Sequence, residues 1–376
     1  MNNKKLRIGI IGGSVNNGWA RTTHIPAVQQ LPELELSAVS TSNMESAEKS
    51  AREFKADHAF ADASELSKHP EVDMVVVSIN VRDHYDAVKE VVSAGKPVYC
   101  EWPLGSNTAQ AMEMQQWTES NHVRNTVGLQ ARQAPEINYV KDLIADGFIG
   151  KVLSVNMKIY TDMMGGVGYK VGAYQFDKKI GGTLLTILGG HSLDALTYML
   201  GDFKEFSSTM ERHYKQAKII DTDEIIEKTA DDQIMITGKL ASGATANVHI
   251  QGGVKHQSGA YLEIYGEEGT IILSAPNTNG HIQMGPYNLL GARQNEGEPK
   301  QSTLQKLTVP DQYFWVPDKI NNEDSRALNV AQAHRKFAKD IQEGTSQMPT
   351  FADAVKLHQL LDAIVKAAET GERQYL

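Results

Sequence analysis

Three features are scarce in this sequence, and each scarcity argues against a class of protein. The chain of 376 residues has one cysteine, Cys100, so it cannot form an intrachain disulfide, which fits a reducing compartment. No apolar run approaches the roughly 20 residues that a membrane-spanning helix needs. Basic residues are outnumbered, since 37 lysines and arginines stand against 46 acidic residues. This balance argues against a nucleic-acid-binding surface, which usually has a basic face.

The composition is otherwise that of an ordinary globular protein. Hydrophobic residues make up 41% and charged residues 22% of the chain. The length exceeds what one hydrophobic core usually organises, so two domains are expected. Residues 1–6 lack the pattern of a cleavable signal. We therefore predict a cytoplasmic protein that binds neither membranes nor nucleic acid directly.

The first third of the chain alternates apolar strands with amphipathic helices. Strands are expected at residues 6–11, 34–40, 74–79, 97–100 and 126–130, and helices at 19–30, 44–54, 84–94, 109–121 and 135–146. Continuous apolar strands separated by helices predict a parallel sheet that is buried on both faces. The expected α/β domain, over residues 1–127, is a doubly wound Rossmann sheet that binds a dinucleotide.

From about residue 151 strands follow one another with only turn signals between them. They are expected at residues 152–160, 203–212, 232–240, 245–251, 261–266, 270–274 and 304–309. This pattern predicts an α+β domain over residues 128–349 with a large, open, mostly antiparallel sheet. One helix at 183–200 and a long surface loop at 276–300 interrupt it. A C-terminal helix within 350–376 is expected to pack back toward the N-terminal domain.

A glycine turn after the first expected strand indicates a nucleotide site. Gly12 matches the first glycine of the G-x-G-x-x-G pattern, whereas Ser14 and Asn17 occupy the other two positions and Gly18 comes one residue late. The turn leads from a strand into a helix, which is the context in which backbone groups approach a pyrophosphate. Cofactor contacts are therefore predicted from Gly12, Gly13, Ser14, Asn17, Gly18 and Trp19.

The ends of the next strands bear on the choice of cofactor. Residues 38–43 contain no acid of the kind that often holds the ribose 2′-hydroxyl of NAD, while Thr41 and Ser42 could face a 2′-phosphate. NADP, or use of both NADP and NAD, is therefore expected. Ser78, Asn80 and His84 follow another strand and are predicted to line the cofactor cleft. For His84, a capping or purely structural role is the alternative.

These segments together resemble the glucose–fructose oxidoreductase/inositol dehydrogenase/rhizopine-catabolism (Gfo/Idh/MocA) family. The resemblance lies in residues 7–13, 78–84, 94–103, 127–135 and 181–194, whose order and spacing along the chain match those of the family motifs. It implies an NAD(P)-binding N-terminal domain in which Glu101, Trp102 and Gln130 also lie near the cofactor. It further implies a C-terminal open sheet with one face over the cofactor cleft and the other in a homodimer or homotetramer.

Within that family the chain is most similar to the galactose-regulator branch. The similarity lies in residues 18–20 and 23–27 and in the tryptophan at position 102. Members of this branch bind a nicotinamide dinucleotide but are not known chiefly as enzymes. A protein partner is therefore implied if this chain is regulatory.

The catalytic residues of the family are only partly present. Family dehydrogenases use a lysine between the glutamate and the proline, together with an aspartate and a histidine on a later helix. Trp102 and Ile187 occupy the lysine and aspartate positions, and His191 alone is retained. His191 could act as a general base or could only hydrogen-bond a ligand, and both roles stay open. Further substrate-contact candidates are Arg132, Tyr160, Lys178 and Lys179.

Two functions consequently stay open. One is an NAD(P)-dependent dehydrogenase of a sugar, polyol or derivative with altered acid–base chemistry. The other is a non-catalytic, dinucleotide-dependent sensor or transcriptional regulator. The remaining histidines show no close metal-ligand spacing along the chain, so no metal is expected.

Overall fold

The computed structural model describes residues 5–16, 18–256, 259–294, 303–317, 320 and 325–376. The chain forms two compact units, each made from two stretches of sequence. Unit 1 comprises Met1–Gln133 and Phe314–His358, and unit 2 comprises Ala134–Tyr313 and Gln359–Leu376. No helix in the described part of the chain is both long and apolar enough to cross a membrane.

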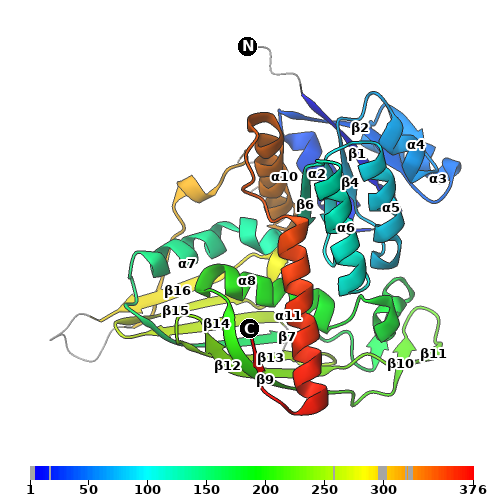
Figure 1. Cartoon of the computed structure of the whole chain (residues 1–376). Coiled ribbons are helices and arrows are strands. Elements are labelled where there is room, and N and C mark those ends of the chain that lie inside the picture. Colours follow the sequence, from blue (N-terminus) through cyan, green and yellow to red (C-terminus); the bar gives the residue numbers. More distant parts are fainter. Residues whose placement is uncertain (1–4, 17, 257–258, 295–302, 318–319, 321–324) are drawn as a thin grey trace. The chain divides into compact units, whose positions relative to one another are not determined.

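Unit 1 is built on a six-stranded parallel sheet with the strand order β3-β2-β1-β4-β5-β6 (Figure 1). In this order the chain steps outward from β1 first to one side and then to the other, as in a dinucleotide-binding fold. The predicted doubly wound Rossmann sheet is therefore confirmed. The strands are β1 (Leu6–Ile11), β2 (Leu34–Ser40), β3 (His58–Phe60), β4 (Met74–Val77), β5 (Val98–Glu101) and β6 (Asn125–Gly128).

Helices flank this sheet, and the strands between them are buried. Ile8 and Ile10 of β1 and Val76 of β4 have no exposed surface, as expected for a parallel sheet covered on both faces. Figure 1 shows α5 and α6 side by side, and α10 packs on α2. The helices are α1 (Trp19–Thr22), α2 (His24–Gln30), α3 (Met44–Phe54), α4 (Ala63–Lys68), α5 (Val81–Ser93), α6 (Thr108–Ser120), the 3₁₀ turn η1 (Gln130–Gln133), α10 (Ser325–Glu343) and the start of α11 (Phe351–Thr370).

Unit 1 differs from the sequence prediction in several short elements. The prediction lacks β3 and α4, which have three and six residues and are too short to show a clear period. The single helix expected at 19–30 is two helices, because Thr23 leaves the helical conformation with φ −132°. The strand expected at 74–79 ends at Val77, and the one expected at 126–130 spans Asn125–Gly128.

Unit 2 contains the predicted large open sheet. Its nine strands have the order β17-β16-β15-β14-β7-β13-β12-β9-β18, and all neighbours are antiparallel except β7 and β13. The strands are β7 (Val152–Tyr160), β9 (Phe203–Glu211), β12 (Gln233–Leu240), β13 (Thr245–Gln251), β14 (Gly259–Gly266), β15 (Gly269–Ala275), β16 (Asn288–Arg293), β17 (Gln305–Lys306) and β18 (Gln374–Tyr375). The predicted fold class of the C-terminal part is therefore confirmed.

A second sheet and several helices complete unit 2. The three-stranded sheet has the order β11-β10-β8 and is absent from the sequence prediction. Its strands are β8 (Val167–Gly168), β10 (Gln216–Ile219) and β11 (Ile225–Glu227). The helices are α7 (Pro135–Ala145), α8 (Gly190–Leu200), the π-helical turn η4 (Leu185–Gly189) and the 3₁₀ turns η2 (Lys170–Phe176), η3 (Lys178–Ile180), η5 (Ile282–Met284) and η6 (Asp311–Tyr313).

Two expectations for unit 2 need correction. The segment 276–300 is not simply a surface loop, because it contains η5 and the strand β16. Leu289 and Gly291 of β16 are buried, but the surrounding Asn, Gly and Gln residues conceal this alternation in the sequence. The helix expected at 183–200 is likewise not uniform, since it begins as the π-helical turn η4 and becomes α-helical at Gly190.

Candidate functional site

The glycine turn of unit 1 requires glycine for a steric reason. Gly12 has φ +92°, and a Cβ at this position would lie 2.1 Å from the backbone oxygen of Ser78. Only a residue without a side chain can therefore lie between the carboxyl ends of β1 and β4. A Cβ on Gly13 would lie 2.9 Å from Val39 Cγ1, so this glycine also permits close packing. Gly12 is half-buried and Gly13 is buried. In dinucleotide-binding folds a glycine turn of this kind lets the backbone approach a pyrophosphate.

The other predicted residues of this turn follow it closely. The N–H of Ser14 donates to Gly12 O over 2.9 Å, which tightens the turn. Gly18 is exposed and has φ +109°, and Trp19 begins α1. Asn17 lies outside the described residues.

The end of β2 presents polar groups without a carboxylate. Thr41 donates from Oγ1 to Asn43 O over 3.0 Å, and Ser42 is exposed. Lys49 on α3 donates from Nζ to Asn16 Oδ1 over 3.5 Å, so an ammonium group lies beside the glycine turn. This arrangement is suited to a negatively charged group more than to a ribose hydroxyl alone.

Asn80 and His84 are both engaged in the connection from β4 to α5. The side chain of Asn80 caps α5 by accepting from Arg82 N over 3.2 Å. His84 is buried, and its Nδ1 and Nε2 lie 2.9 and 3.2 Å from the backbone oxygens of Pro103 and Ile79. Burial lowers the pKa of His84 below its ordinary value. These contacts give both residues a structural role, which was the alternative for His84.

Glu101 ends β5 as a buried carboxylate with several donors around it. Gln130 Nε2 lies 2.8 and 2.7 Å from its two oxygens, and His24 Nε2 lies 2.9 Å from Oε1. His24 Nδ1 lies 2.8 Å from His334 Nε2. Because a carboxylate only accepts, His24 donates from Nε2 to Glu101. A Cβ on Gly128 would lie 2.7 Å from Glu101 Oε1, so glycine makes room for this network.

Sequence reasoning had placed Glu101 and Gln130 near the cofactor but had missed His24 and His334. The two histidines are 310 positions apart, so spacing along the chain gives no hint of their contact. The one available signal is the position of His24 within residues 23–27, a segment that belongs to the family resemblance.

Trp102, which directly follows β5, is a core residue. It is 5% exposed, and its ring lies 4.7 Å from that of His358 on α11 at an angle of 46°. Burial lowers the pKa of His358 to about 4, so the imidazole is neutral at neutral pH. Two neutral rings, tilted against each other, therefore occupy this place, and neither supplies an ammonium group.

Arg132 is engaged in an ion pair of its own unit. Its Nη1 lies 3.3 Å from Asp353 Oδ1, and Asp353 also caps the start of α11 by accepting from Thr350 N over 2.8 Å. The arginine thus ties η1 to α11, and this contact accounts for its position without a substrate.

His191 lies on α8 of unit 2 and is a weak base. It is 4% exposed, and burial together with the nearby His281 lowers its pKa to about 3. Its Nδ1 has no hydrogen-bond partner among the described residues. A neutral imidazole with a spare nitrogen can bind a hydroxyl, but its low basicity makes it a poor acceptor for a full proton.

The ten residues before His191, 181–190, contain no carboxylate side chain. Ile187 is a half-buried aliphatic residue of η4. The hydroxyl of Thr186 donates to Gly181 O over 2.6 Å, which holds the turn that leads into η4.

Tyr160, on β7, is a further predicted substrate contact. Its hydroxyl oxygen lies 3.1 Å from His249 Nδ1, and burial raises the pKa of this tyrosine.

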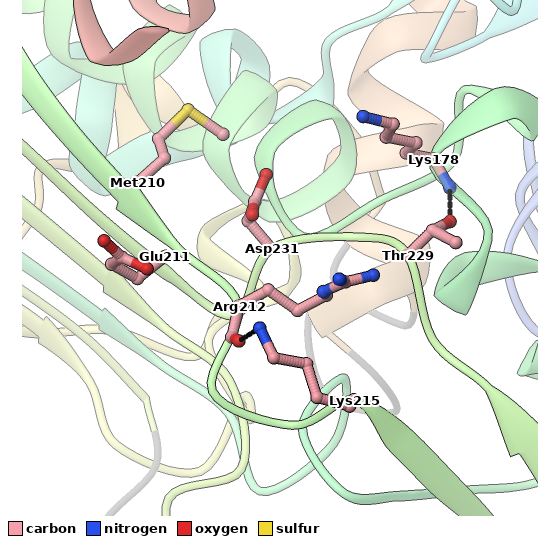
Figure 2. A pocket seen from close by; sticks show the side chains of 7 residues that line it. All are labelled: Lys178, Met210, Glu211, Arg212, Lys215, Thr229 and Asp231. Atoms are coloured by element: carbon pink, nitrogen blue, oxygen red, sulfur yellow. Dashed lines mark hydrogen bonds between the residues drawn. The ribbon is translucent and has the colours of Figure 1, made fainter.

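Lys178 lies at a polar cavity of about 440 Å³ in unit 2 (Figure 2). The cavity contains three basic and two acidic side chains, and its lining residues are Lys178, Met210, Glu211, Arg212, Lys215, Thr229 and Asp231. The N–H of Lys178 donates to Thr229 Oγ1 over 3.0 Å, and Arg212 Nη1 donates to Lys228 O over 2.8 Å. Lys179, Tyr160 and His191 are not among the residues that line it, so the predicted substrate contacts of unit 2 do not share this cavity.

Comparison with known proteins gives two family matches. Residues 6–129 match the model of the oxidoreductase family with an NAD-binding Rossmann fold (GFO_IDH_MocA), and residues 135–275 match that of the Gal80p C-terminal domain. The chain is 26% identical to dehydrogenase aclE of Aspergillus oryzae, over 98% of each protein. It is 24% identical to the galactose/lactose metabolism regulatory protein GAL80 of Saccharomyces cerevisiae, over 97% of this chain and 93% of that protein.

A solved structure shares the fold along the whole chain. Levoglucosan dehydrogenase, in complex with NADH and L-sorbose, has a TM-score of 0.84 at 21% identity and covers 99% of this chain and 98% of its own. Both an enzyme and a regulator are thus among the similar proteins.

We predict that the hydrogen bonds around Glu101 contribute to the stability of the fold. In Glu101→Gln one carboxylate oxygen becomes an NH₂ group, which faces Gln130 Nε2 in either orientation and also faces His24 Nε2 if it takes the place of Oε1. We expect the free energy of unfolding to fall by about 1–3 kcal/mol, since a buried donor then lacks an acceptor. Urea denaturation followed by circular dichroism measures this loss. The exposed Glu53→Gln is the control, and an equal effect of the two substitutions would contradict the assignment.

Proposed function

Because the chain belongs to the Gfo/Idh/MocA oxidoreductase family and has a C-terminal domain of the Gal80p type, we propose that it is an NAD(P)-dependent dehydrogenase of a sugar, polyol or derivative. The observation that carries the proposal is the close approach of Gly12 to Ser78 O at the carboxyl ends of β1 and β4. In doubly wound sheets this is where a dinucleotide binds. Unit 1 would bind the nicotinamide dinucleotide. The part of unit 2 around His191 on α8 would bind the carbohydrate.

The proposed cofactor is NADP, with NAD as the alternative. No acid lies at residues 38–43, and Lys49 Nζ lies 3.5 Å from Asn16 Oδ1 beside the glycine turn. An ammonium group there favours the 2′-phosphate of NADP. The bound dinucleotide would accept or donate the hydride, while Thr41 and Ser42 would contact its adenosine ribose.

The proposed proton acceptor is His191, and the reaction is expected to be slow. In this proposal Trp102 and Ile187 stand at the positions where family dehydrogenases have a lysine and an aspartate. His191 would therefore take the proton of the substrate hydroxyl without help from either group. Its pKa of about 3 makes that transfer unfavourable near neutral pH. Loss of general acid–base help typically costs roughly 100- to 10,000-fold in rate. Low but measurable turnover follows from this chemistry.

A single-turnover experiment tests the proposal. The protein is mixed with stoichiometric NAD⁺ or NADP⁺ and a panel of sugars and polyols, and the absorbance of the reduced nicotinamide is followed. We expect slow reduction with one class of substrate and at least a tenfold slower reaction for His191→Gln. The exposed His213→Gln should react like the wild-type protein.

Two outcomes would overturn parts of this proposal. If no substrate reduces a cofactor that demonstrably binds, the dehydrogenase function is wrong. If His191→Gln reacts as fast as the wild-type protein, the enzyme stands but His191 has no part in proton transfer.

A second function, a dinucleotide-dependent sensor or regulator, has its own supporting observations. Trp102 is buried against His358 where the family has a lysine, and His191 is a weak base. A protein without catalysis needs neither an ammonium group nor a strong base. Tight cofactor binding without hydride transfer would favour this function, and a protein partner would then be expected.

We also propose that the protein forms a homodimer or homotetramer through the open face of the nine-stranded sheet. Met235 on β12 and Tyr265 on β14 are large side chains that are 47% and 37% exposed there. Light scattering of the purified protein should give two or four times the mass of 41.4 kDa. A monomer mass at micromolar concentration would contradict this assembly.

A further inference from the structure

Two histidines and a glutamate converge at the amino-terminal edge of the sheet in unit 1. His58 is the first residue of β3, His69 follows α4, and Glu71 lies shortly before β4. One ligand atom from each residue lies within 4.8 Å of the other two. The rings of His58 and His69 are 4.2 Å apart, and His58 Nε2 lies 2.7 Å from Glu71 Oε2. The short helix α4 turns the chain back and brings these side chains together.

The cluster offers the donor types that bind divalent metals. A neutral imidazole and an ionised carboxylate are the forms that coordinate such an ion, and His58, His69 and Glu71 supply two imidazoles and one carboxylate within reach of one another.

We propose that His58, His69 and Glu71 bind one divalent transition-metal ion, with Zn²⁺ as the best fit, and that water completes its coordination. Two imidazoles and one carboxylate form a common zinc donor set. Tetrahedral Zn²⁺ needs ligand atoms about 3.4 Å apart. Side chains that are 28% and 56% exposed, at His58 and Glu71, can rotate to reach that spacing.

Two existing contacts bear on the affinity of this site. The backbone N–H of Glu71 donates to His69 Nδ1 over 3.3 Å, a long hydrogen bond that a metal ion at this nitrogen would replace. Arg7 Nη1 lies 3.9 Å from Glu71 Oε1 and would repel a cation. Its charge is offset, however, because its Nε and Nη2 donate to the two carboxylate oxygens of Asp73 over 2.9 and 2.8 Å.

The proposed metal site lies away from the predicted cofactor site. His58 and Glu71 lie at the amino ends of β3 and β4, whereas the glycine turn follows the carboxyl end of β1. A metal ion here would therefore link β3 to the segment before β4 and would stabilise unit 1 without a part in hydride transfer. The inference does not depend on the proposed function.

Zinc titration of the full chain, stripped of metal with a chelator, tests the site. We expect isothermal calorimetry to show one Zn²⁺ per chain with micromolar affinity, and Co²⁺ to give the visible absorption of a tetrahedral complex. His58→Gln and His69→Gln should each weaken binding at least tenfold. The exposed His213→Gln, in unit 2, is the matched control and should bind like the wild-type protein.

The same experiment can overturn the proposal in two ways. Absence of binding at millimolar Zn²⁺ would do so, as would binding that His58→Gln and His69→Gln leave unchanged. Because all three histidines retain exposed surface, the variants should keep the wild-type circular dichroism spectrum, which separates loss of the site from loss of the fold.

Discussion

A buried carboxylate organises the dinucleotide-binding unit. Glu101 ends β5, an inner strand of the sheet, and a buried charge in that position is costly unless donors surround it. The donors come from α2 through His24 and from η1 through Gln130, and His334 of α10 extends the chain of hydrogen bonds. The return of residues 314–358 to the first unit is thus tied to the carboxyl end of β5.

The same strand end bears on the proposed proton chemistry. The residue after Glu101 is a tryptophan whose ring lies tilted against that of His358, and neither ring supplies an ammonium group. In unit 2 the retained His191 is buried and weakly basic, and Ile187 cannot ionise. Cofactor binding and hydride transfer need none of these groups to ionise, whereas rapid proton transfer does. This difference explains why a slow dehydrogenase and a sensor are both compatible with the molecule.

The sequence predicts those parts of the fold that depend on long or regular patterns. Apolar runs such as residues 6–11 and 74–77 indicate buried parallel strands, and the structure contains both. The nucleotide contacts expected at Gly12 stay a prediction. Short elements such as β3, and the strand β16 within a polar segment, have too little pattern to be recognised.

Contacts between distant residues escape prediction for a different reason. The pairing of His24 with His334 and the convergence of His58, His69 and Glu71 depend on how the chain returns upon itself. Spacing along the sequence does not encode that return. The burial that weakens His191 as a base is likewise a property of packing, since the sequence shows only an imidazole that ordinarily titrates near neutrality.

The most direct test of the account is the binding of NADPH and NADH, followed by nicotinamide fluorescence, to the wild-type protein, Gly12→Ala and Gly95→Ala. Both glycines have positive φ, +92° and +68°, but an added Cβ meets Ser78 O at Gly12 and nothing within 4 Å at Gly95. We predict that the wild-type protein and Gly95→Ala bind at micromolar dinucleotide and that Gly12→Ala, folded by circular dichroism, does not. Failure of the wild-type protein to bind either dinucleotide, or unchanged binding by Gly12→Ala, would contradict the account.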